Sequence, residues 1–305
     1  MGGAKDSRQD TGPSAAGHRH ADAASSRPRI RLVALDLDGV VWKGGRLLPG
    51  VVNVLEWVLD RGLDLRYVSN NSTAHREAVS ERLADLGLPA GVDRVLTSGF
   101  VTARWLCGRL PEGAPVMVVG EQGLIRELQD VGLDAHHARE ALSPPMGAPP
   151  AAVAVGMDRS FSYDVLAAAQ RAVMEGALFV ATNPDATFPT PDGLLPGSGS
   201  LVAAVATAAE TEPVFMGKPG LALAEILAAV SGVSAGETLF VGDRLSTDIA
   251  MGKAAGMVTL LVLTGVTGES DLRRAEARTD PALLPDHVLA DLGGLPGLVD
   301  ELLRC

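Results

Sequence analysis

Two aspartates one residue apart follow a short apolar stretch near the start of the chain. The stretch, residues 33–39, reads VALDLDG, and apolar residues before a glycine predict a buried strand that ends in a turn. Because alternate side chains of a strand point to one side, we expect Asp36 and Asp38 to project together. Two carboxylates this close repel each other unless a cation lies between them or one is protonated. The pair therefore suits a Mg²⁺ site, or a nucleophile beside a proton donor.

Three further apolar runs end in polar residues that are suited to phosphate and metal binding. In chain order these residues are Ser69 and Asn70, then Lys218, then Asp243 and Asp248. Ligands of open α/β sheets bind at the carboxyl ends of the strands, which is where all of these residues are expected.

The four segments, in this order, resemble the four motifs of the haloacid dehalogenase superfamily of phosphohydrolases. They span residues 30–265, most of the chain. The resemblance implies an α/β protein with a Rossmann-like, doubly wound parallel-sheet core. It also implies a Mg²⁺-dependent phosphomonoesterase that works through an aspartyl-phosphate intermediate.

The resemblance also assigns a role to each motif residue. Asp36 is the expected nucleophile, and Asp38 protonates the leaving alcohol and then activates water. Ser69 and Asn70 donate hydrogen bonds to the phosphoryl oxygens, and Lys218 balances the charge of the phosphate and the nucleophile.

The implied metal ligands are the carboxylate of Asp36, the main-chain carbonyl of Asp38, and Asp243. Asp248 is expected to hold the metal shell from one layer out or through water. Simpler alternatives remain: Asp248 caps the next helix, Ser69 only ends a strand, and Lys218 is a solvated lysine.

Alternating strand and helix patterns position these motifs and predict a sheet covered on both faces. Residues 51–59 and 78–86 each form a helical apolar face that ends at a glycine. Ser98 is the expected cap of a third helix, and Pro219 the expected first residue of the helix after Lys218.

About 140 residues separate the second and third motifs, far more than one crossover needs. Strand patterns at 116–119, 151–155 and 178–182, with a helix at about 162–176, predict a self-contained α/β cap domain. We therefore divide the chain into four parts. They are a disordered tail (1–28), the first part of the catalytic core (29–110), the inserted cap domain (111–212) and the second part of the core (213–305).

The stretches 155–163 and 181–189 resemble the large cap of the class IIA branch. That branch contains enzymes like para-nitrophenylphosphatase, nucleotide phosphatase and phosphoglycolate phosphatase. Its cap loops read the leaving group, which assigns Met157, Asp185 and Phe188 to substrate binding. Gly39 and Asn71 are added to this set from the core, although Asn71 also suits a turn or cap.

The substrate is expected to be a small phosphorylated metabolite. Met157 and Phe188 stand where the similar pyridoxal phosphate phosphatases carry an aromatic stacker and a histidine, and only 4% of all residues are aromatic. We favour glycerol 3-phosphate or 2-phosphoglycolate. The alternatives are a nucleotide or sugar phosphatase of the same branch, a phosphotransferase or phosphomutase, and a non-catalytic binding protein.

Composition limits the partners. A net charge of −11 and a pI near 5.0 argue against a nucleic-acid surface, and no apolar run is long enough to span a membrane. The first 28 residues lack the apolar region of a secretory signal, so we expect a cytoplasmic protein.

Cys107 is expected to be a core or half-buried thiol. The resemblance also implies a homodimer formed through the cap.

Overall fold

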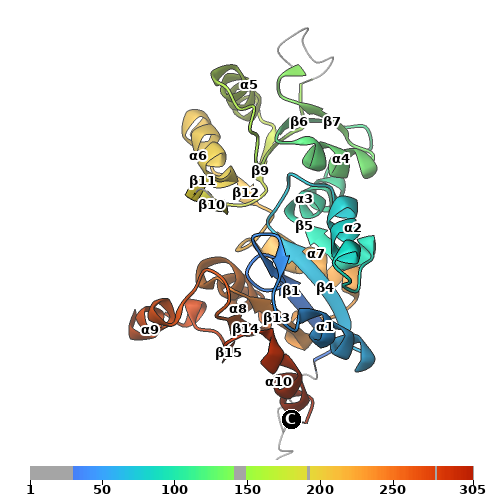
Figure 1. The fold of residues 1–305 in the computed structure, drawn as a ribbon. Coiled ribbons are helices and arrows are strands. Elements are labelled where there is room, and N and C mark those ends of the chain that lie inside the picture. The colour runs from blue at the N-terminus through green and yellow to red at the C-terminus, as the bar shows by residue number, and fades with distance from the viewer. Residues whose placement is uncertain (1–29, 141–148, 191–192, 279, 305) are drawn as a thin grey trace, which may run out of the picture.

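The computed structural model describes residues 30–140, 149–190, 193–278 and 280–304, and it has two lobes (Figure 1). The larger lobe holds a six-stranded parallel sheet of order β15-β14-β13-β1-β4-β5. The strands are β1 (Leu32–Asp36), β4 (Asp64–Ser69), β5 (Val95–Thr97), β13 (Thr238–Gly242), β14 (Val258–Val262) and β15 (His287–Leu289). The fold class expected from the sequence is confirmed. The expected tail (1–28) lies outside the described residues.

Helices pack on both faces of this sheet, so its central strands are apolar throughout. One face carries α1 (Val51–Asp60), α2 (Arg76–Asp85) and α10 (Leu295–Leu302), and the other carries α3 (Ser98–Cys107), α7 (Leu221–Ser231) and α8 (Ala250–Ala255). Along β1, Leu32 and Ala34 join one apolar cluster, whereas Val33 and Leu35 join the other. This two-sided burial fixes the strand that ends in Asp36.

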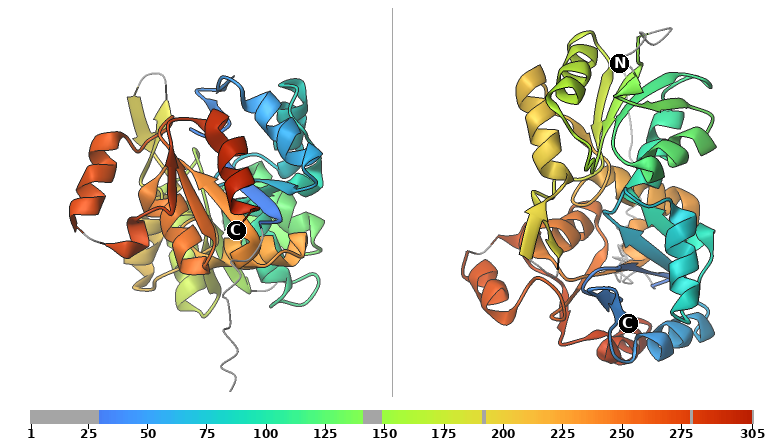
Figure 2. Two further views of the ribbon diagram at one scale, coloured as in Figure 1. Left: turned by 90° about the horizontal axis from the view of Figure 1, so that it is seen from below. Right: turned by 45° about the horizontal axis from the view of Figure 1, so that its top comes forward.

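The smaller lobe holds a five-stranded parallel sheet of order β12-β9-β8-β6-β7. Its strands are β6 (Pro115–Val119), β7 (Asp134–His137), β8 (Ala152–Val155), β9 (Leu178–Ala181) and β12 (Val214–Phe215), and its helices are α4 (Gln122–Asp130), α5 (Tyr163–Met174) and α6 (Ser198–Ala209). Strand β12 follows residue 212, so this sheet takes its edge strand from beyond the range we assigned to the cap. The right view of Figure 2 shows this lobe seated on one end of the core.

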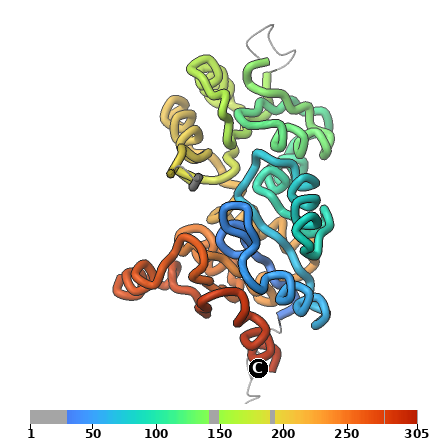
Figure 3. The backbone as a smooth tube through the Cα atoms, viewed as in Figure 1, coloured from blue at the N-terminus to red at the C-terminus, as the bar shows by residue number. Residues whose placement is uncertain are grey.

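Short elements complete the fold. They are the hairpins β2 (Trp42–Lys43) with β3 (Arg46–Leu47) and β10 (Thr187–Thr190) with β11 (Gly193–Pro196), the helix α9 (Glu269–Arg278), the wide helical turn Leu245–Ile249, and the 3₁₀ turns Val92–Arg94, Ala235–Glu237, Pro281–Leu283 and Leu292–Gly294. The tube in Figure 3 follows the chain from the core into the cap after α3 and back after β12.

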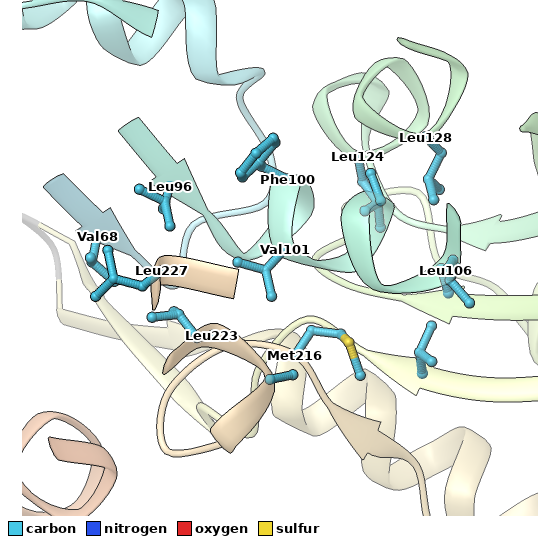
Figure 4. Close-up of a cluster of buried hydrophobic side chains, with 14 of the residues drawn as sticks. Val68, Leu96, Phe100, Val101, Leu106, Leu124, Leu128, Met216, Leu223 and Leu227 are labelled. Carbon is cyan, nitrogen blue, oxygen red and sulfur yellow. The ribbon is translucent and has the colours of Figure 1, made fainter. Parts of the chain in front are cut away.

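One apolar cluster runs without a break from the core into the cap (Figure 4). It joins Leu96 and Val101 of the core to Leu124 of α4, and it includes Met216 and Leu223 on the returning chain. Interfaces between domains allow relative motion unless they are large and apolar. This shared cluster therefore holds the cap on the core at the side where the chain crosses.

Three local expectations were wrong. Thr97, not Ser98, caps α3, because the Thr97 side chain accepts a hydrogen bond from the Phe100 N–H at 3.1 Å. The helix after Lys218 begins at Leu221, since a turn closed by Gly220 N–H on the Gly217 carbonyl (2.7 Å) comes first. Cys107 is exposed at the last position of α3.

Within the described ranges, no helix combines the length and the apolar character needed to cross a membrane.

Candidate active site

A cavity of about 450 Å³ opens between the carboxyl ends of the core strands and the cap. The strand order changes direction beside β1, which pairs with β4 on one side and with β13 on the other. Such a switch point is where open α/β sheets bind ligands. The cavity is lined by every residue that the sequence assigned to a site: Asp36, Asp38, Gly39, Ser69, Asn70, Asn71, Met157, Asp185, Phe188, Lys218, Asp243 and Asp248.

The ammonium group of Lys218 lies between two buried carboxylates. Its Nζ is 2.6 Å from Asp36 Oδ1 and 2.7 Å from Asp248 Oδ1. All three side chains are buried, with exposed fractions of 3% for Lys218, 12% for Asp36 and 1% for Asp248. Lys218 is therefore not a solvated lysine, and it brings the first, third and fourth motifs into contact.

Asp248 also anchors the loop that follows β13. Its Oδ2 accepts hydrogen bonds from the N–H groups of Asp243 (3.2 Å) and Arg244 (3.0 Å). The carboxylate therefore does two things, because it ties down this loop and pairs with Lys218. Asp248 therefore does more than cap the next helix, which was the simpler alternative.

The main chain approaches the Asp243 carboxylate closely at two glycines, which have no side chain in the way. Its Oδ2 accepts a 2.6 Å hydrogen bond from Val266 N–H. A Cβ at Gly265 would lie 1.8 Å from this oxygen, and a Cβ at Gly39 would lie 2.4 Å from it. Gly39 also has φ +86°, a conformation that favours glycine. Gly39 therefore contributes space and a turn to the site.

The buried acids have raised pKa values. Burial raises the pKa of Asp36 well above its usual range; Lys218 opposes this shift, and Asp248 and Asp243 add to it. Burial, with the neighbouring Asp248, raises the pKa of Asp243 to about 6. Burial alone would lower the pKa of Lys218, but Asp248 and Asp36 outweigh it and the net shift is upward. The lysine therefore stays charged.

The three acids fit a divalent metal ion. One carboxylate oxygen each of Asp36, Asp243 and Asp248 lies within 4.8 Å of the other two. The set contains oxygen ligands alone, which hard cations prefer. A cation would relieve the mutual repulsion that adds to burial in raising the pKa values of Asp36 and Asp243. The carboxylate of Asp38 is not part of this set.

Asp38 instead lines the cavity as a solvent-exposed residue. Its Oδ1 accepts a 2.9 Å hydrogen bond from the indole N–H of Trp42. Asp36 and Asp38 therefore line one cavity in different surroundings, one buried against Lys218 and one exposed to solvent.

The loop after β4 divides its polar groups between the cavity and the fold. Ser69 Oγ accepts from Asn71 N–H at 3.2 Å, which leaves its own O–H as a donor. Both amide hydrogens of Asn70 are engaged, since Nδ2 donates to the Lys218 carbonyl and to Asp185 Oδ2, each at 3.0 Å. Asn71 is exposed, and its Oδ1 closes a turn on Thr73 N–H at 2.8 Å. Asn71 therefore acts at least as a turn residue.

Sequence reasoning missed several residues that line the cavity. Arg244 forms a 3.2 Å ion pair with Asp185, and Arg159 pairs with Glu121 at 2.5 Å. Lys43 Nζ donates to the Thr264 carbonyl at 2.9 Å. No local sequence pattern gave a partner for Arg244, because Asp185 is 59 residues away.

Known proteins share this architecture. Residues 33–134 match the model of the haloacid dehalogenase-like hydrolases, and residues 215–295 match a second, HAD-hydrolase-like model. Glycerol-3-phosphate phosphatase of Gallus gallus is 39% identical over 89% of this chain and 93% of its own length.

Two solved structures resemble the whole molecule. The p-nitrophenyl phosphatase from Archaeoglobus fulgidus has a TM-score of 0.79 at 34% identity, covering 90% of this chain and all of that one. The glycerol phosphate phosphatase Rv1692 from Mycobacterium tuberculosis, in complex with magnesium, has a TM-score of 0.77 at 36% identity, covering 88% of this chain and 76% of that one. The chain belongs to the haloacid dehalogenase-like hydrolase family, whose members use a divalent metal, and is a phosphatase.

Proposed function

We propose that this phosphatase hydrolyses glycerol 3-phosphate, or a small phosphate ester much like it, with Mg²⁺ and through a phosphorylated Asp36. The observation that carries the mechanism is the Lys218 ammonium group, 2.6 Å from Asp36 at the cavity floor. A buried cation beside a carboxylate nucleophile offsets the charge that an incoming phosphate brings.

Hydrolysis takes two steps. A carboxylate oxygen of Asp36 attacks phosphorus, the ester P–O bond breaks, and Asp38 gives its proton to the departing alkoxide. Asp38 then takes a proton from water as the water oxygen attacks phosphorus, which releases phosphate and restores Asp36. The exposed position of Asp38 on the cavity lining suits both proton transfers, because the side chain is accessible to a leaving group and to water.

Two groups of the chain stabilise the phosphoryl oxygens in this scheme. Lys218 faces the Asp36 carboxylate, and the free O–H of Ser69 donates at the end of the neighbouring strand. We assign to Asn70 the placement of Lys218, since its Oδ1 also accepts from Lys218 N–H at 2.8 Å. Asp36, Asp243 and the Asp38 carbonyl would hold Mg²⁺, with Asp248 one layer out or bound through water, and the ion would supply charge neutralisation.

The cap side of the cavity favours a neutral polyol as leaving group. Met157, Thr187 and Phe188 offer apolar and hydroxyl surface, while Arg159 and Arg244 are already ion-paired. A carboxylate such as that of 2-phosphoglycolate has to compete with Glu121 or Asp185 for these cations, or bind Lys43. Glycerol 3-phosphate has no such charge. The Gallus gallus relative is named a glycerol-3-phosphate phosphatase, and the Mycobacterium tuberculosis structure is named a glycerol phosphate phosphatase.

A substrate panel tests this proposal. Phosphate release with Mg²⁺ is measured for glycerol 3-phosphate, 2-phosphoglycolate, nucleoside monophosphates, sugar phosphates, pyridoxal phosphate and para-nitrophenyl phosphate, with Asp36→Asn as the inactive control. We expect the highest kcat/KM for glycerol 3-phosphate. A preference for nucleotides or sugars keeps the mechanism and overturns our interpretation of the cap. A dependence on a bisphosphate activator identifies a mutase, and no turnover of any of these esters overturns the proposed substrate class.

Replacing the metal tests the choice of Mg²⁺. Its small size and preference for oxygen match the three-carboxylate site. We expect Mg²⁺ to support turnover in metal-depleted protein and Ca²⁺ to bind without supporting it. Equal turnover with both ions contradicts this choice.

We also propose that two copies pair through the cap. Leu178 on β9 and Val214 on the neighbouring edge strand β12 are exposed, at 40% and 48%. Light scattering after size exclusion is expected to give a dimer, and Val214→Glu a monomer. A monomeric wild type overturns this proposal.

A further inference from the structure

A closed ring of contacts joins the cap to the catalytic lysine, and it enters the core through Asp185. Asp185 Oδ1 accepts from Arg244 Nη1 at 3.2 Å, and its Oδ2 accepts from Asn70 Nδ2 at 3.0 Å. Both oxygens of this cap carboxylate are therefore engaged by the core.

The ring continues through the main chain of Lys218. Asn70 Oδ1 accepts from Lys218 N–H at 2.8 Å, and Asn70 Nδ2 donates to the Lys218 carbonyl at 3.0 Å. Lys218 Nζ meets Asp248 at 2.7 Å, and Asp248 accepts from Arg244 N–H at 3.0 Å. Arg244 then returns the ring to Asp185.

The loop that carries Asp185 is itself held firmly. Asp185 N–H donates to Asn183 Oδ1 at 3.0 Å, and Asn183 Nδ2 donates to the Asn70 carbonyl at 2.8 Å. The loop also packs against the start of α6 so closely that a Cβ at Gly197 would lie 2.2 Å from the Asp185 carbonyl oxygen. The carboxylate is therefore presented at a fixed place.

We propose that Asp185 is a positioning residue, which holds Lys218 through Asn70 and the Asp248 loop through Arg244, and that it does not bind the leaving group. The inference rests on the proposed function, because it concerns the same nucleophile and lysine. It predicts that loss of Asp185 slows every step that needs Lys218, including steps in which no leaving group is present.

Exchange of ¹⁸O between inorganic phosphate and water isolates such a step. In this reaction phosphate loses one oxygen as water when Asp36 attacks, and labelled water restores it when the intermediate is hydrolysed. We expect Asp185→Ala to lower the exchange rate by about 10- to 100-fold, the effect of losing charge-assisted hydrogen bonds. It is expected to lower kcat for glycerol 3-phosphate and para-nitrophenyl phosphate by a similar factor.

Control variants distinguish a positioning role of Asp185 from a general effect on the protein. Asp134→Ala removes an exposed carboxylate from β7, at the far edge of the cap sheet, and is expected to leave exchange unchanged. The Asn70→Ala/Asp185→Ala double variant is expected to lose less than the product of the two single losses, because Asp185 acts partly through Asn70 and partly through Arg244. Where Asp185→Ala does not fold, Asp185→Asn removes the charge and keeps the shape.

The contrary outcome is equally specific. Unchanged exchange in the Asp185 variant, with slower hydrolysis of glycerol 3-phosphate alone, makes Asp185 a substrate-binding residue and overturns the inference. A wild type that neither exchanges nor hydrolyses phosphate overturns the proposed function and the inference with it.

Discussion

The indole N–H of Trp42 donates a 2.9 Å hydrogen bond to the carboxylate of Asp38. Trp42 is buried at the base of the β2–β3 hairpin, and Gly39 N–H donates to the Trp42 carbonyl at 2.7 Å. The hairpin therefore holds the turn that carries Asp38 by two contacts from one residue.

Loss of the indole N–H is expected to weaken proton transfer more than binding. Trp42→Phe keeps an aromatic ring and removes the donor, so Asp38 loses its fixed orientation. We expect kcat for glycerol 3-phosphate to fall about 5- to 50-fold, within the usual range for a general acid. The loss is expected to be smaller for para-nitrophenyl phosphate, whose leaving group needs less protonation. Equal losses for both substrates argue against an effect on Asp38.

Loss of the buried ammonium group is expected to destabilise the metal-free protein. Lys218→Met leaves Asp36 and Asp248 buried without their cation, which costs about 3–5 kcal/mol. Thermal unfolding in EDTA measures this cost. The matched control is Lys253→Met, which breaks a partly exposed pair with Asp286 and is expected to cost less than about 1 kcal/mol. Equal losses contradict our account of Lys218.

The pH dependence of stability is expected to reverse with metal. Since the pKa of Asp243 is about 6 in the folded protein and about 3.9 in an unfolded chain, the folded state binds its proton more tightly. This group's contribution therefore falls as pH rises from about 4 through 6, and the raised pKa of Asp36 acts with the same sign. With Mg²⁺ the protons must leave, so the stabilisation by the ion grows over that interval.

Thermal melts at pH 4.5 to 7.5, with EDTA and with Mg²⁺, measure both trends. Asp243→Asn provides the control, because it removes the titrating group and is expected to flatten the EDTA series. An Mg²⁺-induced shift that is the same at pH 5 and pH 7 contradicts the assignment of Asp243 to the metal.

A methyl group at Gly265 is expected to weaken metal binding. Its Cβ would meet Asp243 Oδ2 at 1.8 Å, so the carboxylate has to move and lose the Val266 N–H bond. We expect Gly265→Ala to raise the Kd for Mg²⁺ by at least about tenfold, as loss of an outer-shell partner does. Calorimetry measures this Kd. The control is Gly297→Ala, where a Cβ meets nothing within 4 Å.

Most motif residues were predictable from the sequence, because they follow apolar runs with the burial pattern of a central strand. β1, for example, is apolar on both faces and leads directly to Asp36. Lys218 instead follows the edge strand β12, whose two residues are exposed and half-buried. The cap was predictable from the length of the insertion and its own strand patterns. The strand patterns did not show which of the two sheets a short strand joins. β12 joins the cap sheet, because it pairs with β9.

Contacts between distant loops were not predictable. Arg244 and Asp185 meet because the cap is folded back over the core, and no local pattern encodes that pairing. The residue that caps the N-terminus of α3 was missed for a related reason. Ser98 has the right residue type, but its Oγ donates to the carbonyl of Asn70 at 2.7 Å, which leaves capping to Thr97.

In the fold of the core, residues 108–215 take the place of one long connecting loop. The core residues near its two ends, Val101 and Met216, lie in one apolar cluster. The entropy of closing a loop grows slowly, by about 0.6 kcal/mol for each doubling of its length. A phosphatase built this way can exchange the whole loop for one of very different size at little cost to the core. The nucleophile and the lysine stay on either side of the insertion, so evolution can change the substrate without rebuilding the chemistry.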